Sequence, residues 1–109
     1  MTEVTTHVLD TAAGRPAAGV PVSLHVREQD GGWEQLGSAT TNTDGRAQAL
    51  AGEGAVNAGV YRLVFDTAAY LEAPAFFDEV IVTFRVTGEH HLHIPLLLSP
   101  YGYSVYRGS

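Results

Sequence analysis

The feature that most constrains this chain is a two-residue alternation of apolar and polar side chains, repeated in short segments between turn residues. It is clearest over residues 90–98. Successive side chains of a β-strand point to opposite faces, so this segment predicts a strand with one mostly aliphatic face. That face carries His90, Leu92, Ile94, Leu96 and Leu98. We expect it to lie in a core, which turns His91 and His93 away from the core.

The same pattern predicts further strands, bounded by Gly, Pro, Asn and Asp. They cover residues 2–10, 20–28, 33–41, 59–66, 79–86 and 103–106, with a short edge strand inside 47–58. The alternation does not decide which side of 2–10 faces the core. One short helix is expected over 68–72, capped by Asp66 or Thr67 and ended before Pro74. The fold class is therefore all-β, a two-sheet sandwich of seven to eight strands with one short helix.

Size and composition limit the classes of function. The 109 residues are expected to form one domain, 1–109, which is long enough to bury a stable core without disulfides or structural metals. There is no cysteine, so disulfides, thiolate metal sites and a cysteine nucleophile are excluded. A net charge of -6 without a basic cluster makes nucleic acid and anionic membrane poor partners. No apolar run approaches the roughly 20 residues of a spanning helix, and the opening residues do not look like a secretion signal. We expect a cytoplasmic protein.

Histidine and arginine are the candidate chemical groups. The chain contains no Gly-x-Ser-x-Gly elbow, phosphate loop or dinucleotide glycine pattern. His93, on the non-core face, could take a proton from water near neutral pH, although a lone histidine there is by itself an ordinary surface residue. His91 lies two positions earlier, about 6.6 Å away by strand rise. We expect it to support the site or the fold rather than react.

Two motifs carry a resemblance to a known family. Residues 91–109, HLHIPLLLSPYGYSVYRGS, closely resemble the C-terminus of 5-hydroxyisourate hydrolases, the transthyretin-like enzymes of urate breakdown. The opening His7-Val8-Leu9-Asp10 and residues 14–20, GRPAAGV, also resemble this family. The resemblance covers essentially the whole chain and implies a transthyretin-like sandwich with one short helix.

The resemblance also implies a set of site residues. His7 matches the active-site histidine of the opening motif, and Arg46 matches the active-site arginine after the Asp-Gly turn. With His93 they form the expected catalytic set. The terminal tetrapeptide places Tyr106 as the expected substrate contact, with Ser109 nearby and Arg107 a weaker candidate. Substrate binding is thus expected from His7, Arg46, Tyr106 and Ser109.

The function implied is hydrolysis of 5-hydroxyisourate to 2-oxo-4-hydroxy-4-carboxy-5-ureidoimidazoline, by opening the six-membered ring at an amide-type C–N bond without a metal or other cofactor. Such a reaction needs a positioned water, a base and positive charge at the developing oxyanion. His7 and His93 could position and deprotonate the water, and Arg46 could stabilise the oxyanion. The sequence does not divide the acid and base roles between the histidines.

The same resemblance implies a homotetramer, a dimer of dimers. The site residues lie on separate strands, on a face directed away from the core. A shallow sheet surface cannot enclose a small polar substrate, whereas ligand pockets enclose most of theirs. We therefore expect the site at a subunit interface.

Three alternatives remain open. His91 and His93 have a spacing that suits zinc, with His7 as a third ligand, although Arg46 nearby would repel a dication. A transthyretin-like carrier would bind small ligands without catalysis. An accessory β-sandwich module would rest only on the Gly-x-Pro-Ala segment that begins at Gly14.

Overall fold

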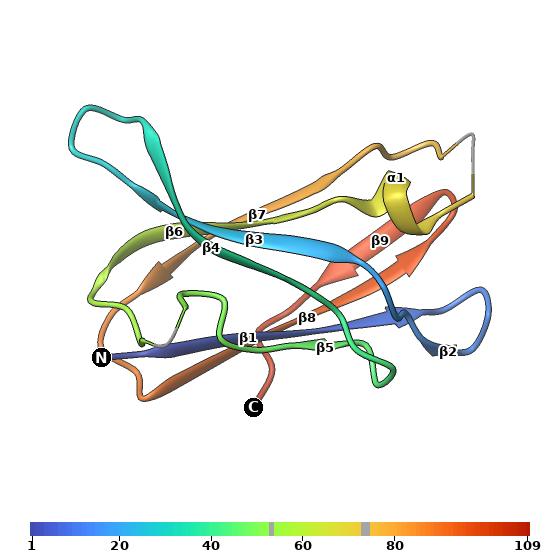
Figure 1. Ribbon diagram of the computed structural model, residues 1–109, viewed down its shortest axis with the longest axis horizontal. Helices are drawn as coiled ribbons and strands as arrows, with labels where there is room; N and C mark the ends of the chain where they lie inside the picture. Colours follow the sequence, from blue (N-terminus) through green and yellow to red (C-terminus); the bar gives the residue numbers. More distant parts are fainter. Residues whose placement is uncertain (53, 73–74) are drawn as a thin grey trace.

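Two β-sheets face each other in the computed structural model, which describes residues 1–52, 54–72 and 75–109 (Figure 1). One sheet has the order β2-β1-β8-β9, with β5 also paired to β1, and the other has the order β4-β3-β6-β7. The first sheet contains β1 (Glu3–Asp10), β2 (Arg15–Pro16), β5 (Arg46–Ala47), β8 (His91–Ser99) and β9 (Gly102–Val105). The second contains β3 (Pro21–Arg27), β4 (Trp33–Thr40), β6 (Gly59–Phe65) and β7 (Val80–Val86).

The predicted all-β, two-sheet architecture with one short helix is confirmed. The described residues contain nine strands, and two of them are only two residues long. One of these short strands, β2, lies within residues 11–19, outside the strands predicted from the sequence. It forms because Leu9 and Asp10, at the end of β1, pair with Pro16 and Arg15.

The alternation of side chains places the core as expected. Val4 and Val8 of β1 are buried, which shows that the even-numbered side of β1 faces inward. On β8 the even-numbered aliphatic side chains are buried, while His91 is exposed and His93 is half-buried. Side chains of both sheets form a single cluster of buried apolar residues, among them Leu24, Leu63, Phe65, Leu96 and Leu98. The two histidines therefore lie on the outer face of their sheet.

The pairing of β1 with β8 is parallel, unlike the other strand pairs in the described residues. Its register sets Thr5 beside His93 and His7 beside Pro95. Parallel neighbours need a long crossover connection, and here most of the chain lies between the two strands. The sequence pattern predicted both strands but not that they are neighbours.

The helix α1 covers Thr67–Tyr70 and lies at one end of the sandwich (Figure 1). Its N-cap is Asp66, whose Oδ1 accepts a hydrogen bond from the backbone N–H of Ala69 at 3.1 Å. The helix ends earlier than the predicted 68–72, because Leu71 adopts an extended backbone. The predicted stop at Pro74 lies outside the described residues. In the described part of the chain, no helix has the length and apolar character needed to cross a membrane.

The turn before β5 holds that strand against β1. Asn42 Oδ1 accepts hydrogen bonds from the backbone N–H groups of Asp44 and Arg46, at 2.9 and 3.0 Å. Gly45 has φ +75° and accepts a hydrogen bond at its carbonyl from the Val8 N–H at 2.7 Å. A Cβ atom on Gly45 would lie 2.4 Å from the Val8 carbonyl oxygen. Only glycine fits this contact, which fixes where Arg46 begins β5.

Gly45 has both a positive φ and a close contact with β1, and a pair of substitutions separates the two effects. Gly14 also has a positive φ, but a Cβ there meets no atom within 4 Å. Gly14→Ala should therefore lower the free energy of unfolding by the backbone strain alone, about 1–2 kcal/mol. Gly45→Ala should lower it by a further 1–3 kcal/mol, roughly the cost of an overpacked contact. Urea unfolding of both variants measures the difference, and equal losses would contradict a close contact between Gly45 and β1.

Candidate active site

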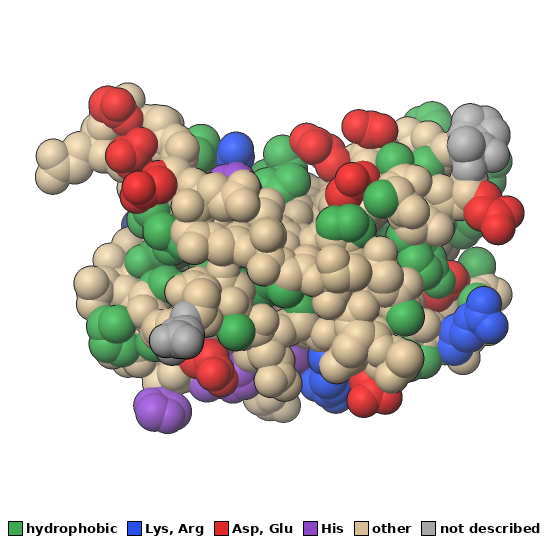
Figure 2. All heavy atoms as spheres, in the orientation of Figure 1, with side chains coloured by type: hydrophobic (Ala, Val, Ile, Leu, Met, Phe, Trp, Pro, Cys, Tyr) green, Lys and Arg blue, Asp and Glu red, His purple; other side chains and the backbone are tan. Residues whose placement is uncertain are grey.

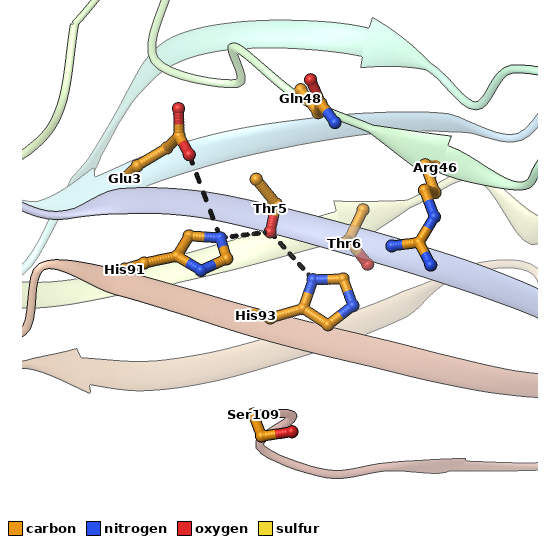
Figure 3. Close-up of a pocket in the computed structure, with 8 residues that line it drawn as sticks. All are labelled: Glu3, Thr5, Thr6, Arg46, Gln48, His91, His93 and Ser109. Atoms are coloured by element: carbon orange, nitrogen blue, oxygen red, sulfur yellow. Dashed lines mark hydrogen bonds and ion pairs between the residues drawn. The ribbon is translucent and has the colours of Figure 1, made fainter.

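A polar hollow of about 250 Å³ lies on the outer face of the sheet that contains β1 and β8 (Figure 3). In the space-filling view, histidine side chains gather along the lower rim of the molecule, with acidic and arginine side chains beside them (Figure 2). The hollow is lined by Glu3, Thr5, Thr6, Arg46, Gln48, His91, His93 and Ser109. It is open to solvent in a single chain. Its size is slightly below the roughly 300–1,000 Å³ of typical small-molecule pockets.

The strand register brings the side chains of this hollow together. Parallel pairing sets Glu3 opposite His91 and Thr5 opposite His93, and these odd-numbered residues share the outer face. On the other edge of β1, antiparallel pairing sets Arg46 opposite His7. Three segments that are far apart in sequence therefore supply the predicted catalytic residues, and the structure brings His7, Arg46 and His93 close together.

Thr5 joins the two histidines of β8. Its hydroxyl oxygen lies 2.8 Å from Nε2 of His91 and 2.8 Å from Nδ1 of His93 (Figure 3). Thr5 is only 6 % exposed. A buried hydroxyl needs hydrogen-bond partners, and these two ring nitrogens provide them. His91 also lies 4.0 Å from the carboxylate of Glu3, beyond hydrogen-bond distance.

His7 lies beside His93 at the border of the hollow. The centroids of the two rings are 6.4 Å apart and the ring planes are inclined by 35°. His7 does not line the hollow itself. A water or a small planar molecule between the two rings could contact both, because the separation leaves room for one bridging group.

The surroundings of His93 lower its pKa. Burial makes the largest contribution, since it disfavours the charged imidazolium. Positive charge on Arg46, His7 and His91 acts in the same direction. His93 thus stays neutral, and able to accept a proton, at a lower pH than an exposed histidine does.

The C-terminal tetrapeptide approaches the hollow through Gly108. The Gly108 N–H donates to the His93 carbonyl at 2.7 Å, and the two residues form an isolated β-bridge. A Cβ on Gly108 would lie 2.9 Å from Cδ2 of His93 and 3.2 Å from the Pro95 ring. Glycine therefore allows the tail to lie against β8, and Ser109 lines the hollow.

Tyr106 lies elsewhere in the single chain. It is 53 % exposed and lines a second, mainly apolar hollow of about 320 Å³. That hollow lies between the edges of the two sheets and is lined by Val82, Phe84, Arg85, Leu92, Ile94, Val105, Tyr106 and Arg107. Arg107 is also 3.9 Å from the Glu89 carboxylate. The structure thus brings Ser109 into the histidine hollow but leaves Tyr106 and Arg107 outside it.

The histidines do not form an evident metal centre. Over residues 1–52, 54–72 and 75–109, no three His, Cys, Asp or Glu side chains are arranged to hold a metal ion. Nε2 of His91 and Nδ1 of His93 both contact the Thr5 hydroxyl. The zinc alternative would require these rings to leave that contact.

Sequence reasoning missed Glu3, Thr5 and Gln48. Alternation along β1 puts Glu3 and Thr5 on the same face as His7. Once the outer face of this strand is known, the sequence therefore predicts that both residues lie on the outer face with His7. Their closeness to His91 and His93 depends on the β1–β8 register, which no local pattern reveals. Gln48 follows β5 in a segment without clear periodicity.

The fold is a two-sheet β-sandwich, and two histidines and an arginine lie together on the outer face of one sheet. Proteins of this class have a polar ligand site on the surface of the sandwich. The family model described as HIUase/Transthyretin family matches residues 4–108, and the chain belongs to this family.

Several relatives share most of the chain. The 5-hydroxyisourate hydrolase of Salmonella dublin is 48% identical over 108 residues, covering 94% of this chain and 78% of the relative. The 5-hydroxyisourate hydrolase of Caulobacter vibrioides is 46% identical, with 100% of both chains covered. The solved structure of Klebsiella pneumoniae 5-hydroxyisourate hydrolase has a TM-score of 0.85, 38% identity and 100% coverage of both chains. Sea bream transthyretin, solved in complex with thyroxine, has a TM-score of 0.89 and 33% identity, covering 96% of this chain and 93% of its own.

The lowered pKa of His93 can be measured directly. We expect an NMR titration of the His93 ring to have its midpoint below the ordinary histidine value of about 6.5. Arg46→Gln should move the midpoint upward, because it removes a neighbouring positive charge. Arg85→Gln, on the outer face of the other sheet, is the matched control and should leave it unchanged. A midpoint that is insensitive to Arg46 would contradict the electrostatic part of this site.

Proposed function

We propose that this protein hydrolyses 5-hydroxyisourate, and that His7, Arg46 and His93 carry the reaction. The observation that carries the proposal is that Arg46 and His93, from separate segments, line one polar hollow, with His7 of a third segment beside His93 at its border. Relatives named 5-hydroxyisourate hydrolase, at 46–48% identity over nearly the whole chain, support the same substrate.

The proposed reaction opens the six-membered ring to give 2-oxo-4-hydroxy-4-carboxy-5-ureidoimidazoline. Water adds to the ring carbonyl carbon, its proton passes to an imidazole, and the carbonyl oxygen becomes an oxyanion. The C–N bond then breaks, and a proton returns to the leaving nitrogen. The carbonyl carbon becomes a carboxylic acid, which releases its proton to solvent and becomes a carboxylate, so one water is consumed and no electrons are exchanged.

Each of the three proposed catalytic residues has a physical role in these reaction steps. His93 is kept neutral by burial and by nearby positive charge, which suits it to accept a proton. The His7 ring, 6.4 Å from that of His93, can hold the same water or return a proton to the leaving group. The Arg46 guanidinium is planar and always charged, so it can bind the oxyanion with two N–H donors.

A non-catalytic carrier is the second candidate, and one observation favours it. Sea bream transthyretin, crystallised with thyroxine, has the same fold with a TM-score of 0.89. The polar character of the hollow argues for the hydrolase, because a carrier of an aromatic ligand gains most from apolar lining.

We further propose that the working form is a homotetramer, a dimer of dimers that covers the hollow. A hollow of about 250 Å³ that is open to solvent encloses too little of a purine-sized substrate. A second subunit over the outer face would exclude water and could bring its Tyr106 or Ser109 equivalents toward the substrate.

Three substitutions test the catalytic set. His7→Ala and His93→Ala should each lower kcat by roughly 10²–10⁴, the usual contribution of a positioned acid or base. Arg46→Ala should lower it by about 10²–10³, as for the loss of one oxyanion partner. The ultraviolet decay of freshly generated 5-hydroxyisourate, corrected for its spontaneous decay and measured after chelator treatment, gives the rates.

The matched control is His90→Ala. His90 is an exposed histidine next to β8, and its side chain lies outside the hollow. The activity of the His90→Ala variant should equal that of the wild type. Wild-type activity in a folded His7, Arg46 or His93 variant would remove that residue from the mechanism. A wild-type protein that binds thyroxine but does not accelerate the decay would favour the carrier.

The assembly is tested by measuring mass and activity together. Sedimentation equilibrium should give a tetramer over the protein concentrations used in the assay. Dilution into the range where the tetramer dissociates should lower the activity per subunit, because the hollow is then open. A monomer with full activity per subunit would contradict the interface site.

A further inference from the structure

We propose that Thr5 is a positioning residue that holds His93 in the tautomer with its proton on Nδ1, leaving a lone pair on Nε2. The proposal rests on the proposed function only for its effect on rate. The tautomer itself follows from the contacts of one hydroxyl group with two rings, together with the position of Arg46.

The hydroxyl of Thr5 limits which ring nitrogens can carry a proton. A hydroxyl has one proton to donate and two lone pairs that accept. Its oxygen contacts His91 Nε2 and His93 Nδ1 at the same distance, 2.8 Å. It can donate to only one of the two nitrogens, so the other must carry a proton and donate to it. The two rings are therefore coupled when both are neutral: either Thr5 donates to Nδ1 of His93 and accepts from His91, or Nδ1 of His93 carries a proton and donates to Thr5.

Arg46 selects between these arrangements. The Nδ1 atom of His93 points to Thr5, and the other ring nitrogen is turned toward the side of the hollow where Arg46 lies (Figure 3). A guanidinium has donors and positive charge but no acceptor. A lone pair on Nε2 faces it favourably, whereas an N–H there would face it unfavourably. His93 then donates from Nδ1 to Thr5, and Thr5 donates to Nε2 of His91.

Besides Arg46, the side chains of His7, His91 and Glu3 act on this chain of contacts. His7 lies 6.4 Å from His93 between ring centroids, and His91 lies 6.2 Å from it. Both add positive charge when protonated, which again favours a lone pair on His93. The Glu3 carboxylate acts in the opposite direction, since it favours a proton on Nε2 of His91. Its distance of 4.0 Å and its exposure make this a weak effect.

This tautomer assigns the base and acid roles to His93 and His7. A neutral imidazole accepts a proton only at the nitrogen that carries the lone pair. With Nδ1 directed to Thr5, that nitrogen is Nε2, on the side of the hollow where Arg46 would bind the oxyanion. His93 is then the base, and His7 is left to return the proton to the leaving nitrogen. In the opposite tautomer, His93 would present an N–H and could not take a proton from water.

The tautomer can be read without any activity. Long-range ¹⁵N–¹H correlation spectra distinguish a protonated ring nitrogen from one with a lone pair. At about pH 8, above the ordinary titration range of histidine, wild-type His93 should carry its proton on Nδ1. The signal is assigned by its absence in His93→Ala. A proton on Nε2 in the wild-type protein would overturn the proposal, whether or not the protein hydrolyses 5-hydroxyisourate.

Two substitutions then test the effect on rate. Thr5→Val keeps the shape but removes the hydroxyl, and should lower kcat roughly ten- to hundred-fold with KM changed by less than about twofold. Thr5→Ser restores the hydroxyl and should recover most of kcat. Thr83→Val, on the outer face of the other sheet, controls for the exchange of threonine for valine and should match the wild type.

The outcomes separate the two proposals. If the wild-type protein does not hydrolyse 5-hydroxyisourate, the proposed function fails while the spectra still decide the tautomer. If the protein is active and a folded Thr5→Val variant has the wild-type kcat, the role of Thr5 fails while the function stands. Equal losses in Thr5→Ser and Thr5→Val would also overturn it, because they would show that shape rather than the hydroxyl matters.

Discussion

The parallel pairing of β1 with β8 is the constraint on which the rest of this structure depends. It joins residues 3–10 to residues 91–98, so almost the whole chain is enclosed between two neighbouring strands. The entropy lost by closing a loop grows only slowly with its length, so the distance in sequence is a modest cost. Apolar side chains of both strands offset it by entering the core. The same pairing brings Thr5 to His91 and His93. A separate antiparallel pairing of β1 with β5 sets Arg46 opposite His7 on the other edge of β1.

Adjacent threonines show how one strand serves the core and the site together. Thr6 faces inward, is fully buried, and donates from its hydroxyl to the Ile94 carbonyl at 2.6 Å. Thr5 faces outward and contacts the two imidazoles. A slip of one residue in this register would exchange these faces and bury polar side chains in place of Val4 and Val8. The core thus enforces the register that sets Thr5 opposite His93.

Much of this fold could be predicted from local patterns, and the site could be predicted only in part. Alternation located the long strands and turned His91 and His93 outward. The helix cap was predicted to be Asp66 or Thr67, and the structure shows Asp66. Local patterns cannot show which strands are neighbours, so the contact of Thr5 with both histidines was missed. The resemblance supplied His7, Arg46 and Ser109, and the structure brings all three to the same region. It leaves Tyr106 in a separate hollow, because the tail reaches His93 only through Gly108, two residues later.

Desolvation links the single chain to the proposed assembly. Even in one subunit, burial is the largest cause of the lowered pKa of His93, so the site is partly removed from water before anything covers it. A covering subunit would lower the local dielectric further, and the positive charge of Arg46 would then act more strongly on His93 and on an oxyanion. Burying Arg46 without a partner would be costly, whereas burying neutral imidazoles is not. The hydroxyl of Thr5 lets His91 and His93 share hydrogen bonds while both are neutral. A second subunit would cover the carboxylate of Glu3 and the guanidinium of Arg46 together, and in the proposed reaction the oxyanion of the substrate would compensate the charge of Arg46.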